Sequence, residues 1–286
     1  MSVHSELKTL TAGIALGESP RWHDGRLWFS DWGAGELVAV DLEGNREVVL
    51  TMASFPFCFD WLPDGRLLVV SGREGLLLRQ EPDGTAVTHA DLRPLSAGPW
   101  NELVVDHAGS AYCNTIGFDF PGGEFRPGLV ARVTPDGAAR AVAGDVAFPN
   151  GMALTPDGST LLVAESYAHC LTAFTVESDG GLANRRVWAA AGDHSPDGVC
   201  LDAEGAAWYA DVGSGTCVRV AEGGGVVDAV EVGQGCFSCA LGGPDGRTLF
   251  IVTSDWPPNL AARAGRVVMT QVAAPAAGFP SGREAP

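Results

Sequence analysis

The chain has few basic residues and no long apolar run, and these two absences limit the partners that it can have. Its 286 residues include 18 Lys and Arg against 35 Asp and Glu, which gives a formal net charge of −17 at pH 7. A surface of this charge repels phosphate groups, so the sequence predicts no nucleic-acid partner. No apolar run approaches the ~20 residues that a membrane-spanning helix requires. We therefore expect neither nucleic acid nor a membrane among its partners.

The N-terminal residues and the cysteines indicate a cellular location. The chain does not begin with a basic segment followed by an apolar core, so no secretory signal is visible. Its seven cysteines are an odd number, and several lie in apolar segments, where a thiol behaves as a small hydrophobic group. Cys236 and Cys239 have C-x-x-C spacing, but there is no second pair and no helix follows them. We expect free thiols in a reducing, cytoplasmic environment.

Helical periodicity is also absent, because no window of the sequence shows a sustained apolar stripe at helical spacing. The chain instead contains 38 glycines and 18 prolines, as a protein with many turns requires. With 46% hydrophobic residues it can form one large core. These features predict an all-β protein.

A turn glycine between two short apolar segments recurs along the chain. In the clearest copy, Pro156-Asp157-Gly158 forms the turn between apolar runs at 152–154 and 161–164. The equivalent glycines are Gly25, Gly65, Gly109, Gly158, Gly205 and Gly246. They lie 40 to 49 residues apart, a period typical of propeller blades with about four strands each. Six repeats predict a single six-bladed β-propeller domain over residues 1–272.

The two ends of the chain are expected to meet in the last blade. Propellers usually close by combining strands from both chain ends in one blade. We expect residues 7–14 to join the blade that contains Leu249–Thr253 and Arg266–Gln271. The last residues, 273–286, are low in complexity, and we expect them to form a flexible C-terminal tail.

Polar residues recur at one phase of the repeat, eight residues before the turn glycine and seven before it in the first repeat. Because the innermost strands of a propeller surround its axis, equivalent positions form a ring at one mouth of the channel. The six positions are Glu18, Phe57, Asn101, Asn150, Asp197 and Ser238. Four of them are Glu, Asp or Asn, whose oxygen atoms suit a hard divalent cation such as Ca²⁺. The alternative is that these polar residues cap strands or line a hydrated channel.

Three short motifs of the chain resemble those of a known family. They are Gly-Glu-Ser-Pro at 17–20, Phe-Pro-Asn-Gly at 148–151 and Ser-Pro-Asp-Gly at 195–198. With them, nearly the whole chain resembles the senescence marker protein (regucalcin)/gluconolactonase family of calcium-dependent lactonases. The resemblance implies a metal held by Glu18, Asn150 and Asp197, with Asp197 also placed to act as a general base.

Asn101 matches an asparagine that lies on the substrate side of the site in this family. In the similar diisopropyl-fluorophosphatase propellers the matching asparagine is a fourth metal ligand, so both roles stay open for Asn101. The metal implied is Ca²⁺, although Zn²⁺, Mn²⁺ and Fe²⁺ also accept ligands of this kind.

One position departs from the family pattern. Members that act on sugar lactones carry an arginine two residues before this asparagine, where the chain has Pro99. The surrounding loops are aromatic instead, at Trp32, Phe57, Trp100, Phe118 and Phe120. Aromatic walls favour a flat or apolar ligand, so we expect Trp100 and Phe118 to contact the substrate beside Asn101. The alternative is that these rings pack between blades.

Together these residues predict a metal-dependent hydrolase that opens a small-molecule lactone. Attack on the carbonyl builds an oxyanion that a dication stabilises, while Asp197 accepts a proton from the attacking water. No Gly-x-Ser-x-Gly motif supports a serine nucleophile. Two alternatives remain: hydrolysis of another ester or a phosphotriester in the same site, and a non-enzymatic calcium-binding or scaffold propeller. The sequence leaves the natural substrate and the oligomeric state open.

Overall fold

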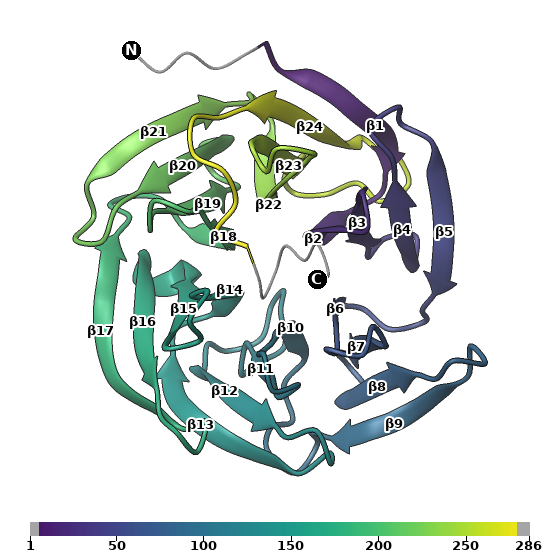
Figure 1. Cartoon of the computed structure of the whole chain (residues 1–286), viewed down its shortest axis with the longest axis vertical. Helices are drawn as coiled ribbons and strands as arrows, with labels where there is room; N and C mark the ends of the chain where they lie inside the picture. Colours follow the sequence, from purple (N-terminus) through teal and green to yellow (C-terminus); the bar gives the residue numbers. More distant parts are fainter. Residues whose placement is uncertain (1–5, 279–286) are drawn as a thin grey trace.

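Six four-stranded antiparallel sheets surround a central axis in the computed structural model, which describes residues 6–278 (Figure 1). The predicted six-bladed β-propeller is confirmed. The innermost strands of the blades are β2 (Gly17–His23), β6 (Phe57–Trp61), β10 (Trp100–Val105), β14 (Pro149–Leu154), β18 (Pro196–Leu201) and β22 (Gly235–Gly242). The second strands are β3 (Arg26–Asp31), β7 (Leu67–Ser71), β11 (Ala111–Thr115), β15 (Thr160–Glu165), β19 (Ala207–Asp211) and β23 (Thr248–Ser254).

The outer half of each blade consists of a third and a fourth strand. The third strands are β4 (Glu36–Val40), β8 (Leu76–Gln80), β12 (Gly128–Val133), β16 (Cys170–Val176), β20 (Thr216–Val220) and β24 (Gly265–Gln271). The outermost strands are β5 (Arg46–Thr51), β9 (Ala86–Asp91), β13 (Ala139–Val146), β17 (Leu182–Ala190), β21 (Val226–Glu231) and β1 (Lys8–Ile14). One turn of 3₁₀ helix, η1 (Ser166–Ala168), follows β15.

Strand β1 closes the ring, as the sequence predicted. It pairs antiparallel with β24, so the last blade has the order β1-β24-β23-β22 and contains strands from both ends of the chain. Closure of this kind leaves every inner strand with neighbours on both sides, and the channel is enclosed all the way round.

The segment after β24 lies against the turn that joins the first two strands in each of the last two blades. The amide of Ala203 donates to Pro275 O at 2.8 Å, and the amide of Ala276 donates to Gly246 O at 2.8 Å. Ala274 is buried. Residues 273–278 are thus hydrogen-bonded to the propeller, although they belong to the predicted tail. Residues 279–286 lie outside the described residues, and the flexible tail stays a prediction.

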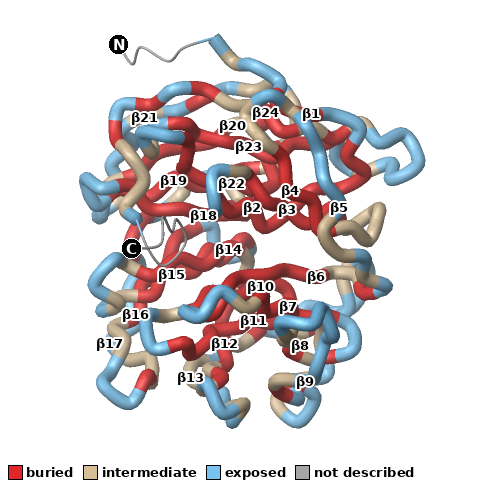
Figure 2. The backbone as a smooth tube through the Cα atoms, turned by 45° about the vertical axis from the view of Figure 1, so that its right-hand side comes forward, coloured by how far each residue is buried: buried red, intermediate tan, exposed pale blue. Residues whose placement is uncertain are grey.

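Apolar side chains fill the space between neighbouring blades. Leu68 and Val70 of β7, for example, are buried in one cluster with Leu103 and Val105 of β10. Figure 2 shows buried residues concentrated in the inner strands and exposed residues on the turns and outer strands. Burial of one such side chain contributes about 1.5–3 kcal/mol, so the fold depends mainly on the strands. The residues at the ends of the channel are therefore free to serve a site.

The turn between the first two strands of each blade explains the repeat in the sequence. All six turn glycines have φ between +69° and +84°. Only glycine adopts this conformation without strain, which is why the same residue marks each blade.

Two further expectations concern the thiols and the membrane. All seven cysteines are free, and all seven are buried, whereas the sequence placed only several of them in apolar segments. Among residues 6–278 no helix has the length and apolar character needed to cross a membrane.

Candidate active site

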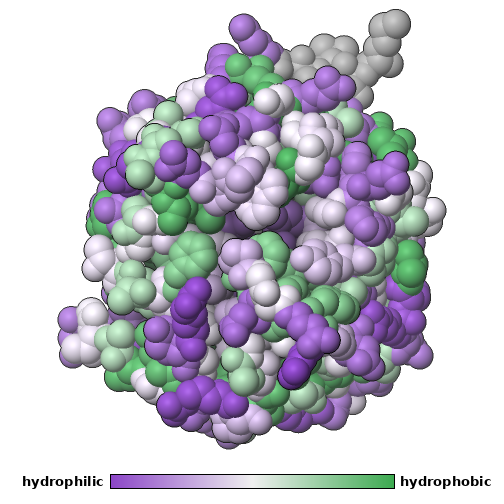
Figure 3. Space-filling model, turned by 180° about the vertical axis from the view of Figure 1, so that it is seen from behind, coloured by the Kyte–Doolittle hydropathy of each residue, from purple (hydrophilic) through white to green (hydrophobic). Residues whose placement is uncertain are grey.

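The four Glu, Asp and Asn residues of the predicted ring occupy the same point of four innermost strands. Glu18, Asn101, Asn150 and Asp197 are each the second residue of their strand. The innermost strands of neighbouring blades contact one another around the whole ring, so these side chains reach one end of the channel. Figure 3 shows the face on which these strands begin, opposite to the C-terminal segment, and this face is hollowed near its centre.

Irregular strand pairing accompanies the polar positions. The register against the second strand shifts between Glu18 and Arg21 in β2, and comparable shifts occur near the start of β10, β14, β18 and β22. Such a bulge bends a strand and changes the direction of a side chain. The innermost strand β6 begins with the apolar ring member, Phe57, and has a regular register. The bulges thus coincide with the polar ring members.

Glycines directly after two ring residues let neighbouring blades approach closely. A Cβ atom on Gly198 would lie 1.9 Å from Ser238 Oγ, and one on Gly151 would lie 2.5 Å from the Val199 nitrogen. No side chain fits at either position. The Asn-Gly and Asp-Gly pairs of the motifs therefore combine a polar side chain with close packing of the inner strands.

Hydrogen bonds orient the two amide side chains of the ring. Asn101 Nδ2 donates to Asn150 Oδ1 at 3.1 Å and to Pro149 O at 3.4 Å. Asn150 Nδ2 donates to Ser166 Oγ at 3.4 Å, and this hydroxyl donates to Pro196 O at 2.7 Å. Both N–H groups of Asn101 are thus used, and its Oδ1 atom is the end of the amide available as an acceptor.

The two carboxylates of the ring are buried. Glu18 is 6% exposed and Asp197 is 9% exposed. The Ser19 amide donates to Glu18 Oε2 at 3.3 Å. By contrast, Asp197 Oδ1 is buried and has no hydrogen-bond partner among residues 6–278. A buried polar atom in this state costs about 1–3 kcal/mol, which marks it as a position for a ligand.

The carboxylates also hold their protons more tightly than exposed ones do. Burial raises the pKa of Glu18 well above its ordinary range, and the negative charges of Asp197 and Glu102 add to the rise. Burial also raises the pKa of Asp197, followed by the charges of Glu102 and Asp211. Buried carboxylates with raised pKa values favour a positive charge beside them.

A divalent cation fits this arrangement of residues. Within residues 6–278 no group of three or more His, Cys, Asp or Glu side chains is arranged to hold a metal ion. The candidate centre contains two such side chains, Glu18 and Asp197, and its other oxygens come from the amides of Asn101 and Asn150. Two carboxylates with amide oxygens form a hard ligand set of the kind that Ca²⁺ prefers.

A buried hydrogen-bond network lies next to Glu18, and the sequence reasoning missed it. Ser19 Oγ donates to Glu102 Oε2 at 3.0 Å, and Arg21 Nη2 donates to Glu102 Oε1 at 3.1 Å. Ser19 has a φ of +49°, a strained value for serine. Ser19 belongs to the first motif and Arg21 directly follows it, so the motif was a signal. Glu102 lies 83 residues from Ser19 in sequence, and nothing local indicates that contact.

Asp60 is a second buried carboxylate near Arg21. It accepts hydrogen bonds from the amides of Trp61 at 2.8 Å and Val105 at 2.9 Å. Burial raises the pKa of Asp60 to about 6, and the positive charge of Arg21 opposes this rise. Asp60 thus changes charge in a pH range where exposed aspartates are already ionised.

The aromatic residues do not all lie where the sequence placed them. Trp100 and Phe57 have no exposed surface, and Trp100 packs in the core between the second and third blades. Trp100 therefore offers no surface to a substrate, because its ring points into the packing between strands. Phe118 instead lies in a separate cluster with Phe148 and Phe120.

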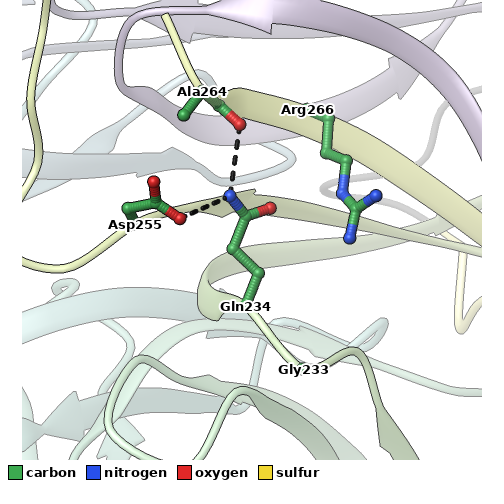
Figure 4. A pocket seen from close by; sticks show the side chains of 5 residues that line it. All are labelled: Gly233, Gln234, Asp255, Ala264 and Arg266. Atoms are coloured by element: carbon green, nitrogen blue, oxygen red, sulfur yellow. Dashed lines mark hydrogen bonds between the residues drawn. The ribbon is translucent and has the colours of Figure 1, made fainter. Parts of the chain in front are cut away.

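A polar hollow of about 350 Å³ lies on the last blade (Figure 4). It is lined by Gly233, Gln234, Asp255, Ala264 and Arg266. Gln234 Nε2 donates to Asp255 Oδ1 at 2.9 Å and to Ala264 O at 3.2 Å. None of the predicted site residues lines this hollow, so it is separate from the candidate centre.

Comparison with known proteins identifies the family and agrees with the fold. The family model described as SMP-30/Gluconolactonase/LRE-like region matches residues 16–255. A 6-deoxy-6-sulfogluconolactonase of Pseudomonas putida is 26% identical over 91% of this chain and 94% of its own length. Pentonolactonase XacC of Haloferax volcanii is 28% identical over 86% of this chain and 84% of its own length. The chain also resembles the solved structure of regucalcin, a calcium-binding protein from Agrobacterium tumefaciens, with a TM-score of 0.78 at 22% identity. This match covers 97% of this chain and 95% of the regucalcin chain, and it shows the same fold.

Proposed function

Because this chain belongs to the SMP-30/gluconolactonase/LRE-like family, we propose that it is a lactonase, an enzyme that opens a lactone ring with water. The similar proteins named 6-deoxy-6-sulfogluconolactonase and pentonolactonase support this activity. We also propose that the reaction depends on a divalent cation, Ca²⁺ in the first place, held by Glu18, Asn150 and Asp197.

The observation that carries the cation proposal is the pair of buried carboxylates at the channel mouth. Asp197 Oδ1 lacks a hydrogen-bond partner among the described residues, and the charge of Asp197 helps to raise the pKa of Glu18. A cation beside these oxygens offsets both the cost of the unpaired Asp197 oxygen and the repulsion between the two carboxylates. When bound, it supplies a Lewis acid for the carbonyl oxygen of the lactone.

Asp197 is the proposed general base. Its carboxylate lies at the start of β18, at the channel mouth beside the other proposed cation ligands, where it is placed to accept a proton from water. It takes a proton from the water whose oxygen forms a bond to the carbonyl carbon. The bond from that carbon to the ring oxygen then breaks, and the proton passes to the ring oxygen, which leaves a hydroxy acid.

Asn101 is proposed to act through its Oδ1 atom, because both of its N–H groups donate within the protein. This oxygen accepts a hydrogen bond from a substrate hydroxyl or serves as a further cation ligand. Phe118 is proposed to act as part of the aromatic cluster that it forms with Phe148 and Phe120. The buried free thiols support a reducing, cytoplasmic location.

A rate assay on several lactones tests the function. Protein freed of metal by a chelator is assayed alone and after addition of Ca²⁺, Zn²⁺, Mn²⁺ or Fe²⁺. We expect ring opening only with added cation. If no lactone in the panel is opened with any of these cations, while a carboxylic ester or phosphotriester is hydrolysed, the lactonase proposal is wrong.

A further inference from the structure

Five aromatic side chains form an exposed patch beside the candidate metal centre. This aromatic patch consists of Phe118, Phe120, Phe125, Phe148 and Tyr167, whose contacting ring centroids are 4.7–6.2 Å apart. Phe118 and Phe148 are buried, whereas Phe125 is 47% exposed and Tyr167 is 48% exposed. The patch therefore has a packed base and presents two rings to solvent.

The patch connects directly to a proposed cation ligand. Phe148 precedes Asn150 by two residues, and Tyr167 follows Ser166, whose hydroxyl accepts from Asn150 Nδ2 at 3.4 Å. The segment 116–127 that carries the three other rings joins β11 to β12, on the face where the inner strands begin. A substrate whose reacting carbonyl is near Asn150 thus has the patch within reach of its substituent.

The base of the patch is held firmly by its backbone. The Ser166 amide donates to Phe148 O at 3.1 Å, and the Tyr167 amide donates to Ala147 O at 3.2 Å. Phe148 has a φ of +56°, which is strained for a bulky residue and persists only where the surroundings impose it. The ring of Tyr167 stacks on that of Phe148 at a centroid distance of 4.7 Å. The Tyr167 ring is therefore held on the base of the patch before any ligand binds, and the Phe125 ring contacts it at a centroid distance of 5.6 Å.

Exposed, pre-arranged rings suit one kind of substituent. Ring faces and edges offer no strong hydrogen-bond partners to hydroxyl groups, whereas another aromatic ring gains from stacked or edge-on contact. Pro99, at the position before Trp100, likewise has no side-chain donor for a hydroxyl. We propose that the aromatic patch binds an aromatic ring of the substrate, so that the enzyme acts on aryl-substituted lactones. This inference rests on the lactonase function proposed above.

The test compares γ-phenyl-γ-butyrolactone with unsubstituted γ-butyrolactone, and the quantity of interest is the ratio of their kcat/KM values. We expect this ratio to be about tenfold lower in Tyr167→Ala and in Phe125→Ala than in the wild-type protein. A tenfold change is the effect expected from the loss of one aromatic contact and the apolar area that it buries. Tyr167→Phe keeps the ring and should keep the ratio. Trp256→Ala is the matched control, because Trp256 is 55% exposed on the same face but lies on the last blade. If Tyr167→Ala lowers both kcat/KM values equally, the patch serves only the fold and the inference is wrong.

A binding assay decides the inference independently of catalysis. γ-Phenyl-γ-butyrolactam has the same ring size and substituent, but an N–H group replaces the ring oxygen and the ring resists opening. Its affinity is measured by calorimetry. We expect Tyr167→Ala to weaken this affinity by about tenfold, with Trp256→Ala unchanged. Equal affinity of the wild-type protein for the lactam with and without its phenyl group would overturn the inference. Failure of the wild-type protein to open any lactone would refute the proposed function instead, and the lactam affinities would still decide the role of the patch.

Discussion

Asp197 and Asn150 have different tasks in the proposed reaction, although both are proposed cation ligands. Asp197 supplies a negative charge and a basic oxygen, and its Oδ1 atom has no partner among residues 6–278. Asn150 supplies a neutral oxygen whose position is set by hydrogen bonds to Asn101 and Ser166. Substitution of the two residues should therefore have consequences that can be told apart.

Asp197→Asn keeps the size of the side chain and an oxygen atom but removes the charge and the basicity. We expect kcat for lactone opening to fall by about 100-fold to 10,000-fold, the usual effect of losing a general base, and excess cation should not restore it. Asn150→Ala should chiefly weaken the binding of the cation, so a high cation concentration should restore part of the activity of this variant. The measurement is a cation titration of the rate for both variants. Full recovery of Asp197→Asn by added cation would show that Asp197 is a ligand alone.

Asp60 predicts how stability depends on pH. Its folded-state pKa of about 6 lies above the ordinary value of 3.8, so the folded state binds more protons between these values. The stabilising contribution is complete below pH ~4 and is lost as the pH rises through ~6, by about 3 kcal/mol in all. In Asp60→Asn the decrease of Tm between pH 4 and pH 7, measured in chelator, should therefore be smaller than in the wild-type protein.

Asp64→Asn is the control for this experiment. The side chain of Asp64 is largely exposed, and its hydrogen bond with Arg66 lowers its pKa below the ordinary value of 3.8. Asp64 therefore titrates below the measured range, and Asp64→Asn should leave the decrease of Tm between pH 4 and pH 7 unchanged. Asp60→Asn also loses one of two accepted backbone hydrogen bonds, and its stability at any single pH is expected to be lower. The slope is the diagnostic quantity. An unchanged slope in Asp60→Asn would mean that Asp60 does not titrate in this range.

At the scale of the elements, the innermost strands β14 and β18 each combine a bulge with a close contact to the next blade. The shift in register near Asp197 changes the direction of its side chain, and Gly198 brings β18 against Ser238 of β22. Position of the carboxylate therefore depends on packing between two blades as well as on its own backbone.

Gly198→Ala tests this dependence. The added Cβ would lie 1.9 Å from Ser238 Oγ, so the two strands must separate. We expect a loss of about 1–3 kcal/mol in stability and a cation affinity weakened by about tenfold or more, because Asp197 moves with the strand. Gly205→Ala is the control: it has a φ of +79° but no atom within 4 Å of the added Cβ, so it should lower Tm without changing cation affinity. Calorimetry and thermal unfolding measure both effects, and unchanged cation affinity in Gly198→Ala would contradict the argument.

At the scale of the whole molecule, the architecture follows from residues that repeat. The six turn glycines all have positive φ, and this common conformation made the blade period visible in the sequence. The same counting placed Glu18, Asn101, Asn150 and Asp197 at one phase, and they occupy the same position in four inner strands. Repetition thus predicts both the fold and the position of the candidate centre.

Features without repetition could not be predicted in this way. The sequence analysis placed Trp100 at the mouth, but the ring of Trp100 is buried in the core. A strand residue can face either the channel or the neighbouring blade, and the repeat does not show which. The contact between Ser19 and Glu102 joins distant blades, and no local pattern reports it. Phe125 and Tyr167 lie outside the strands in non-repeating loop segments, and their proximity appears only when blades three and four are packed together.

The central claim is that one divalent cation, held by Glu18, Asn150 and Asp197, is required for lactone opening. The most direct measurement is a calorimetric titration of chelator-treated protein with Ca²⁺, with the rate of lactone opening followed in the same samples. Glu18→Gln tests the ligand, and Glu43→Gln, on an exposed turn, is its control. The account predicts one bound cation per chain in the wild-type protein and in Glu43→Gln, a rate that rises with the fraction bound, and much weaker binding in Glu18→Gln. Lactone opening at full rate with no cation bound would contradict it.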